Sequence, residues 1–166
     1  MPCYHFTYHG YATWMPDRPR GYVHRTKGLQ PRDPHMADRY RNNQRETNKW
    51  FGDEQIDVMF DVVREKQEHV NLTVHGMAAD ATHLHILVSW TSDKSFEKIR
   101  AGIMSSVTRA LNDRFGKRTW ISRNPSRKRV RDFGHFDYLL LEYFPKHLRH
   151  WGNPEDRDAA LSRKRG

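Results

Sequence analysis

The sequence predicts an α+β protein with a ferredoxin-like βαββαβ antiparallel sheet. The first observation is the order of its periodic segments, which follow one another as strand, helix, strand, strand, helix, strand. The second is the length, because 166 residues are enough for one domain with a substantial core. The third is a further helical period near the C-terminus. It predicts a helix on the sheet face that the first two helices leave open.

The N-terminal part predicts a strand and then a long basic excursion. Residues 4–13 are rich in aromatic and β-branched side chains, which favours a strand. Residues 14–50 contain four prolines, nine Lys or Arg and four Asp or Glu, without convincing periodicity. We expect an extended surface excursion there, with a short helix around 36–49.

The central region predicts a helix followed by a β-hairpin. Apolar side chains recur with helical spacing at Ile56, Met59, Phe60 and Val63. They indicate an amphipathic helix from Asp53, its expected N-cap, to about residue 69. A strand over 70–79, a tight turn at 80–81 and a strand over 82–90 then form the hairpin.

A second helix is expected between Ser95, a suitable N-cap, and Phe115, with Gly116 placed to end it. Its apolar stripe consists of Phe96, Ile99, Ile103, Val107, Ala110 and Leu111. Residues 117–131 follow with seven Lys or Arg and no acid. We expect two short strands there, joined at Asn124-Pro125.

The last part predicts a helix from Asp132 to about Phe144, which Pro145 must end or kink. A strand over 138–141 is the alternative. Residues 153–166 are highly charged, and we expect a disordered tail. Residues 1–152 are then expected to form a single domain.

The composition favours a nucleic-acid partner. The formal net charge is +9, and clustered Lys and Arg release counterions when they bind a polyanion. Cys3 is the only cysteine, which excludes a disulfide framework and a cysteine zinc site. Neither a signal peptide nor an apolar run near the ~18 residues of a membrane helix is evident, so we expect a cytoplasmic, nucleoid-associated protein.

His83 and His85 are the main candidates for chemistry. They lie two positions apart in a strand, so both side chains face the same way, opposite to the apolar series Leu84, Ile86, Val88 and Trp90. Two imidazoles on one sheet face can converge on a divalent metal. Two are too few for a tight site, and the candidates for a third ligand are Glu142 and His147.

Tyr143 and His147 are four residues apart and share one face of the expected C-terminal helix. If this helix crosses the open sheet face, a phenolic hydroxyl and a metal ligand reach the histidine pair together. That combination is suited to phosphoryl transfer through a covalent phosphotyrosine. Tyr138, with Glu142 four residues further on, is the alternative nucleophile.

These motifs resemble those of a known family. His83-Leu84-His85 resembles the HUH motif of single-strand DNA endonucleases with one catalytic tyrosine. The segment from Tyr143 to His147 is similar to the motif of a tyrosine and a ligand four residues later on their C-terminal helix. Segments 8–16, 19–21 and 126–130 also resemble the IS-two-hundred-like and REP-associated tyrosine transposases.

The resemblance implies a homodimeric DNA transposase that cleaves and rejoins single-stranded DNA through a 5′-phosphotyrosine and binds hairpin DNA. It implies Mg²⁺ or Mn²⁺, with Tyr143 as the nucleophile and His83, His85 and His147 in the metal-ligand positions. This chain differs in having His147 where the family often has Gln, and in having Pro145 between nucleophile and ligand.

The basic segment is the expected DNA surface, in which cationic side chains hold phosphates and a tryptophan stacks on a base. The residues concerned are Arg118, Trp120, Arg123, Arg127, Lys128, Arg129 and Arg131. His75, on the neighbouring strand, is expected at the surface. A non-catalytic nucleic-acid-binding module or repressor on the same fold, and a nuclease that uses water, are the alternative functions.

Overall fold

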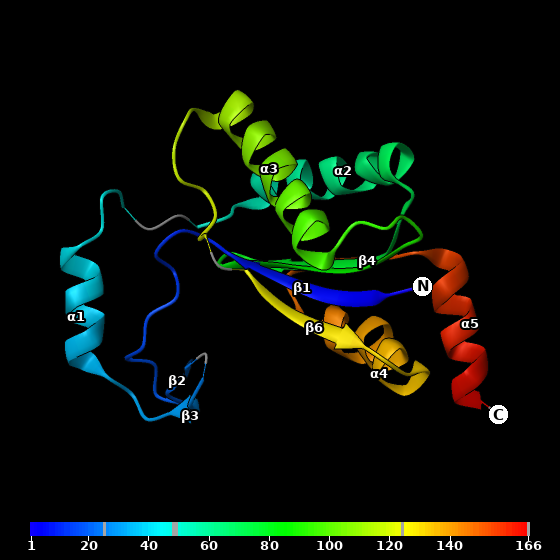
Figure 1. The fold of residues 1–166 in the computed structure, drawn as a ribbon, viewed down its shortest axis with the longest axis horizontal. Helices are drawn as coiled ribbons and strands as arrows, with labels where there is room; N and C mark the ends of the chain where they lie inside the picture. Colours follow the sequence, from blue (N-terminus) through cyan, green and yellow to red (C-terminus); the bar gives the residue numbers. More distant parts are fainter. Residues whose placement is uncertain (25, 48–49, 124, 166) are drawn as a thin grey trace.

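A computed structural model describes residues 1–24, 26–47, 50–123 and 125–165 (Figure 1). The strands are β1 (Cys3–His9), β2 (Tyr22–His24), β3 (Gly28–Gln30), β4 (Leu72–Asp80), β5 (His83–Trp90), β6 (Ser126–Val130) and β7 (Arg149–Gly152). The helices are α1 (Pro34–Asn42), α2 (Asp53–Val70), α3 (Phe96–Phe115), α4 (Phe133–Tyr138), the π-helix η1 (Leu139–Tyr143), the 3₁₀-helix η2 (Phe144–Lys146) and α5 (Pro154–Arg165).

The main sheet has five strands in the order β6-β1-β5-β4-β7, and every pairing is antiparallel. Without the edge strand β7, the elements β1-α2-β4-β5-α3-β6 are the predicted βαββαβ unit. The predicted hairpin is present as β4 and β5. The predicted fold class is confirmed.

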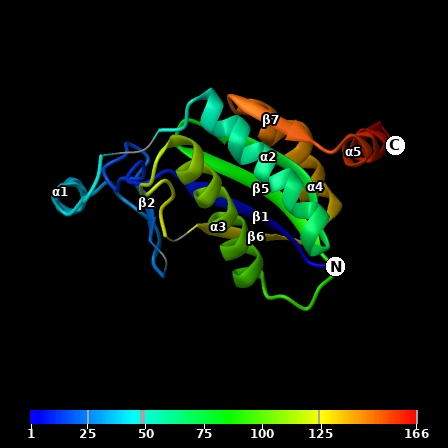
Figure 2. The ribbon, with the colours of Figure 1, turned by 90° about the horizontal axis from the view of Figure 1, so that it is seen from above.

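The two long helices cover one face of this sheet (Figure 2). Leu84, Ile86 and Val88 on β5 are fully buried beneath them, as the alternation of the strand predicts. Helix α3 begins after Ser95 and ends at Gly116, as predicted, and Gly116 has a φ of 90° that suits glycine. Helix α2 begins one residue earlier than predicted. Its N-cap is Gly52, whose N–H donates to Oε1 of Gln55 at 2.9 Å.

The other face of the sheet carries the segment α4-η1-η2. A second apolar cluster lies between this segment and the sheet and consists of Ala78, Leu87, Val130, Leu139, Leu140 and Phe144. Close packing depends on Gly76 of β4, because a Cβ there would lie 2.6 Å from Leu140 and 3.0 Å from Phe144. The C-terminal helix therefore crosses the open face, as the sequence predicts.

This segment is helical throughout, but its hydrogen bonding changes along its length. The N–H of Phe144 bonds the carbonyl of Leu139, five residues back, and the chain then tightens into the 3₁₀ turn with Pro145. Proline lacks an N–H, so an α-helix cannot continue regularly through it. The π-helix η1 ends at Tyr143. Because residues 138–141 are helical, the alternative prediction of a strand there was wrong.

Residues from about 14 to 24 and from 26 to 45 form an arm beside the sheet (Figures 1 and 2). The arm contains the predicted helix, α1, capped by the side chain of Asp33, but the helix ends at Asn42. The end of the predicted range, at 48–49, lies outside the described residues. The arm also contains the small hairpin β2–β3, in which Val23 pairs with Leu29. This hairpin leaves no alternating pattern in the sequence, because each strand has only three residues.

Two predictions nearer the C-terminus were wrong. Residues 154–165 form helix α5 rather than a disordered tail, and Ala160 of α5 is fully buried. In the described part of 117–131 there is one strand, β6, and a single bridge between Gly10 and Ile121 in place of the other. Asn124, half of the predicted turn, lies outside the described residues.

Candidate metal and tyrosine site

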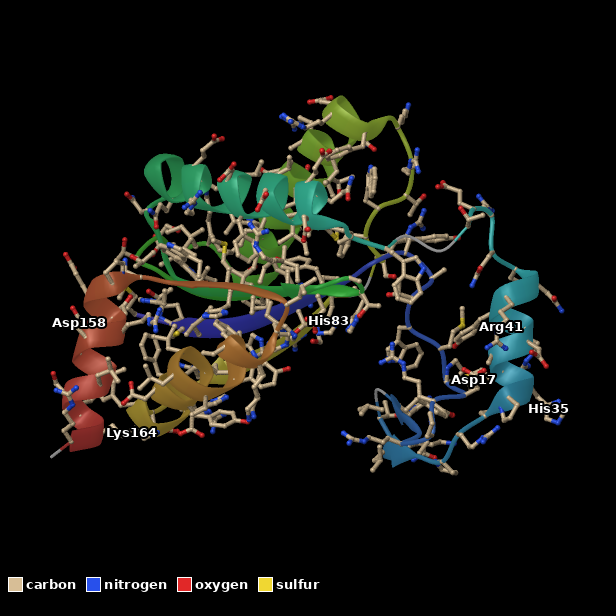
Figure 3. All side chains as sticks on the ribbon, turned by 180° about the vertical axis from the view of Figure 1, so that it is seen from behind. Asp17, His35, Arg41, His83, Asp158 and Lys164 are labelled. Atoms are coloured by element: carbon tan, nitrogen blue, oxygen red, sulfur yellow. The ribbon has the colours of Figure 1, made fainter. Side chains whose placement is uncertain are left out.

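Three histidines from two parts of the chain meet on the sheet face opposite α2 and α3. His83 and His85 lie on β5, and His147 follows η2. One ring nitrogen from each lies within 4.8 Å of the other two. Figure 3 shows His83 on the side of the body that faces the arm. The structure therefore brings the three histidines together, and they could bind one metal ion.

Hydrogen bonds determine which ring nitrogens are available. Nδ1 of His147 lies 3.1 Å from the carbonyl oxygen of Tyr143, and a carbonyl only accepts, so this nitrogen carries the proton. Nδ1 of His83 bonds the hydroxyl of Thr82 at 2.8 Å, and Nδ1 of His85 bonds the hydroxyl of Thr7 at 2.9 Å. Partners on Nδ1 leave Nε2 of each ring for a metal.

Asp80 was not singled out in the sequence, but it belongs to the site. Its Oδ2 lies 3.4 Å from Nε2 of His83 and 3.9 Å from Nε2 of His147. Its Oδ1 accepts the N–H of Leu148 at 2.8 Å, which orients the carboxylate. Asp80 is the last residue of β4 and looked like part of a turn. Its pairing with His83 across the hairpin was the available signal.

The Tyr143 hydroxyl lies 3.5 Å from Nε2 of His85. Tyr143 is half-buried, with its ring packed edge-to-face against the rings of His85 and His147 at 5.3 and 4.9 Å. The Tyr138 ring is 42% exposed and lies 6.2 Å from that of Tyr143. Glu142, the possible ligand in the Tyr138 alternative, instead pairs with Lys164 at 2.9 Å.

Burial keeps His83 and His85 neutral by lowering the pKa of each ring. Desolvation lowers the pKa of His85 to about 2, with nearby histidines adding to the effect, and it is also the main cause that lowers the pKa of His83. Neutral imidazole is the form that binds a metal. Burial raises the pKa of Tyr143, and Tyr138 and Asp80 raise it further, so the phenol is protonated at neutral pH.

The contacts of His5 and His75 were not predictable from the sequence. Nε2 of His5 lies 2.9 Å from Nδ1 of His85, so His5 is a neighbour of the site. His75 is buried, contrary to the expected surface position. Its Nδ1 lies 2.7 Å from Oδ2 of Asp156 on α5, and its Nε2 lies 2.8 Å from the hydroxyl of Ser89. These bonds fasten α5 to the sheet.

The predicted DNA-binding residues do not form a single surface. On the edge strand β6, Lys128 pairs with His5 and lies on the histidine face. Arg127 and Arg129 pair with Phe6 and Tyr4 and lie on the helical face, where the Arg127 guanidinium covers the Phe96 ring at 4.2 Å. Arg118, Arg123 and Arg131 are exposed.

The prediction that Trp120 stacks on a base was wrong. Its side chain is only 4% exposed, because it packs in the main core against Phe115, with the Arg118 guanidinium 5.1 Å from the ring. No face of the indole is left for a base. An aromatic residue in a basic segment is not evidence of exposure.

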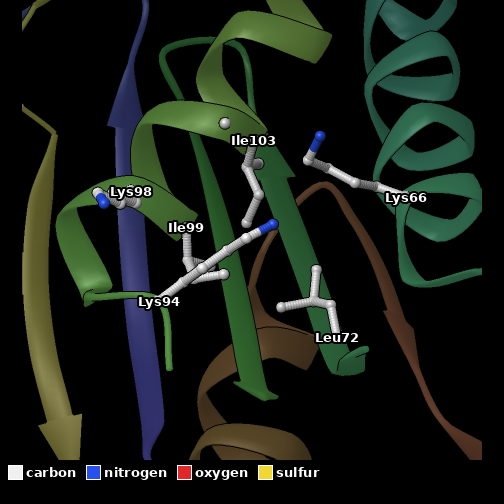
Figure 4. A pocket seen from close by; sticks show the side chains of 7 residues that line it. Lys66, Leu72, Lys94, Lys98, Ile99 and Ile103 are labelled. Atoms are coloured by element: carbon white, nitrogen blue, oxygen red, sulfur yellow. The ribbon is translucent and has the colours of Figure 1, made fainter. Parts of the chain in front are cut away.

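Among the described residues, two of the cavities that lie outside the histidine site have a distinctive lining. One, of about 90 Å³, opens between α2 and α3 with Lys66, Lys94 and Lys98 around an apolar floor (Figure 4). Lys66 donates to the hydroxyl of Ser106 at 2.9 Å, and burial lowers its pKa. The other, of about 190 Å³, lies between α1 and the segment after β1.

Within the described ranges, no helix is long and apolar enough to cross a membrane.

No protein-family model and no curated protein matches the chain. Among solved structures, the chain is similar to a REP-associated tyrosine transposase bound to a REP hairpin, with a TM-score of 0.46 and 9% identity. The match covers 87% of this chain and 68% of that chain. A likeness this distant assigns neither an activity nor a residue role to this chain.

Proposed function

We propose that the chain is a metal-dependent single-tyrosine transposase of the HUH type, which cleaves and rejoins single-stranded DNA. The observation that carries the proposal is the meeting of the Tyr143 hydroxyl with three histidines that could hold one metal ion. Two histidines that were merely solvated on a strand would have no reason to carry a hydrogen-bond partner on each Nδ1. They would also have no reason to lie beside a tyrosine from a distant part of the chain.

The proposed reaction is a transesterification. The Tyr143 oxygen bonds to the phosphorus of a phosphodiester, and the bond from phosphorus to the 3′ oxygen breaks. The proton that the phenol loses is balanced by the proton that the 3′ oxygen gains. The 5′-phosphotyrosine conserves the bond energy, so the freed 3′-OH of another strand can reverse the step and rejoin the DNA.

A divalent cation would be held by His83, His85 and His147, with Asp80 beside it, and would polarise the phosphoryl oxygen and favour ionisation of the phenol. Imidazole-rich sites suit transition metals, whereas Mg²⁺ prefers oxygen ligands. Of Mg²⁺ and Mn²⁺, we therefore propose Mn²⁺ as the better ion.

The proposed substrate is hairpin-bearing single-stranded DNA, and the proposed active form is a homodimer in the nucleoid. The net charge of +9 supports a polyanionic substrate. Light scattering with and without a hairpin oligonucleotide measures the molar mass of the protein. A dimer requires the mass of two chains, and the mass of one chain would reject it.

A covalent-capture assay tests the activity. Purified protein is mixed with labelled single strands and hairpins from the DNA flanking its gene, with Mn²⁺, and run on a denaturing gel. We expect a shifted band that disappears with EDTA and in Tyr143→Phe but persists in Tyr138→Phe. Tight binding without an adduct would favour the non-catalytic module, and free products without an adduct would indicate hydrolysis by water.

A further inference from the structure

We infer that the cavity between α1 and the segment after β1 binds one unstacked nucleobase of the DNA strand that enters the histidine site. This inference rests on the proposed function for the identity of the polymer. The cavity, here called the arm cavity, is lined by Tyr11, Ala12, Trp14, Met15, Tyr40, Asn43 and Gln44.

The lining of the arm cavity suits a nucleobase. Tyr11, Trp14 and Tyr40 contribute three aromatic rings, and Asn43 and Gln44 contribute amides. Bases stack on aromatic side chains, and amides read base edges. The hollow is small, about 190 Å³, and open to solvent, which suits a group that lies against the aromatic rings rather than one that is enclosed.

Gln44 provides a second observation at the arm cavity. Its Nε2 is buried and has no hydrogen-bond partner among the described residues. A buried donor without a partner is destabilising, and most such groups in proteins are satisfied. A base edge in the arm cavity offers an acceptor to this N–H after a rotation about the last side-chain torsion, which is a soft one.

The walls of the arm cavity are held in place before any ligand binds. The N–H of Arg45 donates to the Tyr11 hydroxyl at 3.3 Å, and the Trp14 ring packs edge-to-face on Tyr22 at 6.1 Å. Arg41 pairs with Asp17, and this tie fixes α1 to the loop that carries Trp14 (Figure 3). Preorganised walls reduce the entropy lost on binding.

Cations for the flanking phosphates lie next to the arm cavity in sequence. Arg39 and Arg45 adjoin Tyr40 and Gln44, and in the part of the chain that the structure describes neither guanidinium has an ion-pair partner. Two nearby carboxylates, Asp17 and Asp38, share the Arg41 guanidinium, which offsets one of their two negative charges and leaves Arg39 and Arg45 to meet a phosphate. A phosphate on either side of a seated base therefore meets positive charge.

Thr82 connects the arm cavity to the histidine site. Its carbonyl accepts bonds from the N–H of Gly10 at 2.8 Å and the hydroxyl of Thr13 at 3.2 Å, at the start of the cavity segment. Its own hydroxyl bonds Nδ1 of His83. The segment that lines the arm cavity is thus joined through a single residue to the strand that carries His83.

Binding without cleavage tests the inference. The full chain in EDTA is titrated against a labelled oligothymidylate and an abasic oligomer of the same length, which has the same phosphates but no bases. We expect the oligothymidylate to bind about 5- to 150-fold more tightly, as one or more stacked bases would give. This preference should disappear in Tyr40→Ala and persist in Tyr40→Phe, which keeps the ring. Equal affinities, or a preference that Tyr40→Ala leaves unchanged, would overturn the inference.

Gln44→Met gives a second, sharper outcome. Removing the unpartnered buried donor should raise the Tm of the free protein and at the same time weaken base-dependent binding. Gln30→Met, the same change on β3 outside the arm cavity, should do neither. A lower Tm with unchanged binding would assign Gln44 a purely structural role and reject the cavity as a base site. Base-dependent binding without any covalent adduct would reject the proposed transposase and leave the arm cavity standing.

Discussion

The Tyr143 hydroxyl lies 3.5 Å from Nε2 of His85, although the two residues are 58 positions apart in the chain. The contact requires that β5 present its histidines away from the main core and that the helical segment after α4 cross the same face. Gly76 makes this crossing possible by leaving room for Leu140 and Phe144. The site is therefore a product of the layer arrangement rather than of one local motif.

Thr7→Val is expected to weaken Mn²⁺ binding by about 10- to 100-fold, because it removes the hydroxyl that orients His85 through Nδ1. Electron paramagnetic resonance of free Mn²⁺ measures the affinity. Thr73→Val is the matched control, since Thr73 is exposed on β4. Equal affinities for the two variants would exclude an orienting role for Thr7.

Asp80→Asn removes a negative charge beside His83 and His147 while keeping an oxygen that can accept the N–H of Leu148. We expect Mn²⁺ affinity to fall by about fivefold or more, because a carboxylate near a dication contributes at least ~1 kcal/mol. The unfolding midpoint of the metal-free protein should change little. Asp113→Asn, an exposed position on α3, should leave both quantities unaltered. Unchanged affinity in Asp80→Asn would remove Asp80 from the site.

Gly76→Ala is expected to destabilise the protein by ~1–3 kcal/mol and to reduce adduct formation, because the new methyl group overpacks against Leu140 and Phe144 beneath the Tyr143 segment. Urea unfolding and the covalent-capture assay measure the two effects. Gly102→Ala is the control. A Cβ there has no neighbour nearer than 3.7 Å, and alanine in helix α3 should stabilise by ~0.5–1 kcal/mol. A stable, fully active Gly76→Ala variant would contradict the packing described.

Asp156→Ala should loosen α5 from the sheet, because it leaves Nδ1 of the buried His75 without its partner. The expected loss is ~1–3 kcal/mol in unfolding free energy, with faster proteolysis after residue 153. Asp158→Ala removes an exposed carboxylate on the same helix and should have little effect. Similar losses in both variants would mean that α5 is held by general charge rather than by His75.

The metal-free protein is expected to lose stability as pH falls from 7 to 5. Burial lowers the pKa of His5 and His9 to about 4 in the folded state, against 6.5 for an ordinary histidine. Between these values the unfolded chain binds more protons, so acid favours unfolding. Urea midpoints in EDTA measure the slope, which should flatten in His9→Gln but not in His35→Gln, an exposed position. A midpoint as high at pH 5 as at pH 7 would contradict this assignment.

The periodic elements were predictable because their signal is local. The strand that carries His83 and His85 buries the side chains that its spacing predicts. The stripe of α3 does so at Ile99, Ile103, Val107 and Leu111, whereas Phe96 and Ala110 are only partly buried. Helix α5 was missed because its sequence is highly charged, and it is held by tertiary contacts such as the bidentate Arg163–Asp137 pair. Contacts of that kind leave no periodic pattern.

The candidate site was predictable only in part. His83, His85, Tyr143 and His147 could be grouped by spacing and by resemblance, and the structure brings them together. Asp80 and Thr7 reach the site through strand pairing, which single-residue patterns do not reveal. The exposure of Trp120 could not be predicted either. Its ring is buried by packing against Phe115, a contact that the spacing of residues in the sequence does not show.

Tyr143 itself is expected to become joined to the 5′ end of cut DNA. Mass spectrometry of the digested covalent adduct, after nuclease trimming of the DNA, identifies the modified residue directly. We expect a peptide with a nucleotide phosphate on Tyr143. The same mass on Tyr138, or cleaved DNA with no modified peptide, would contradict it.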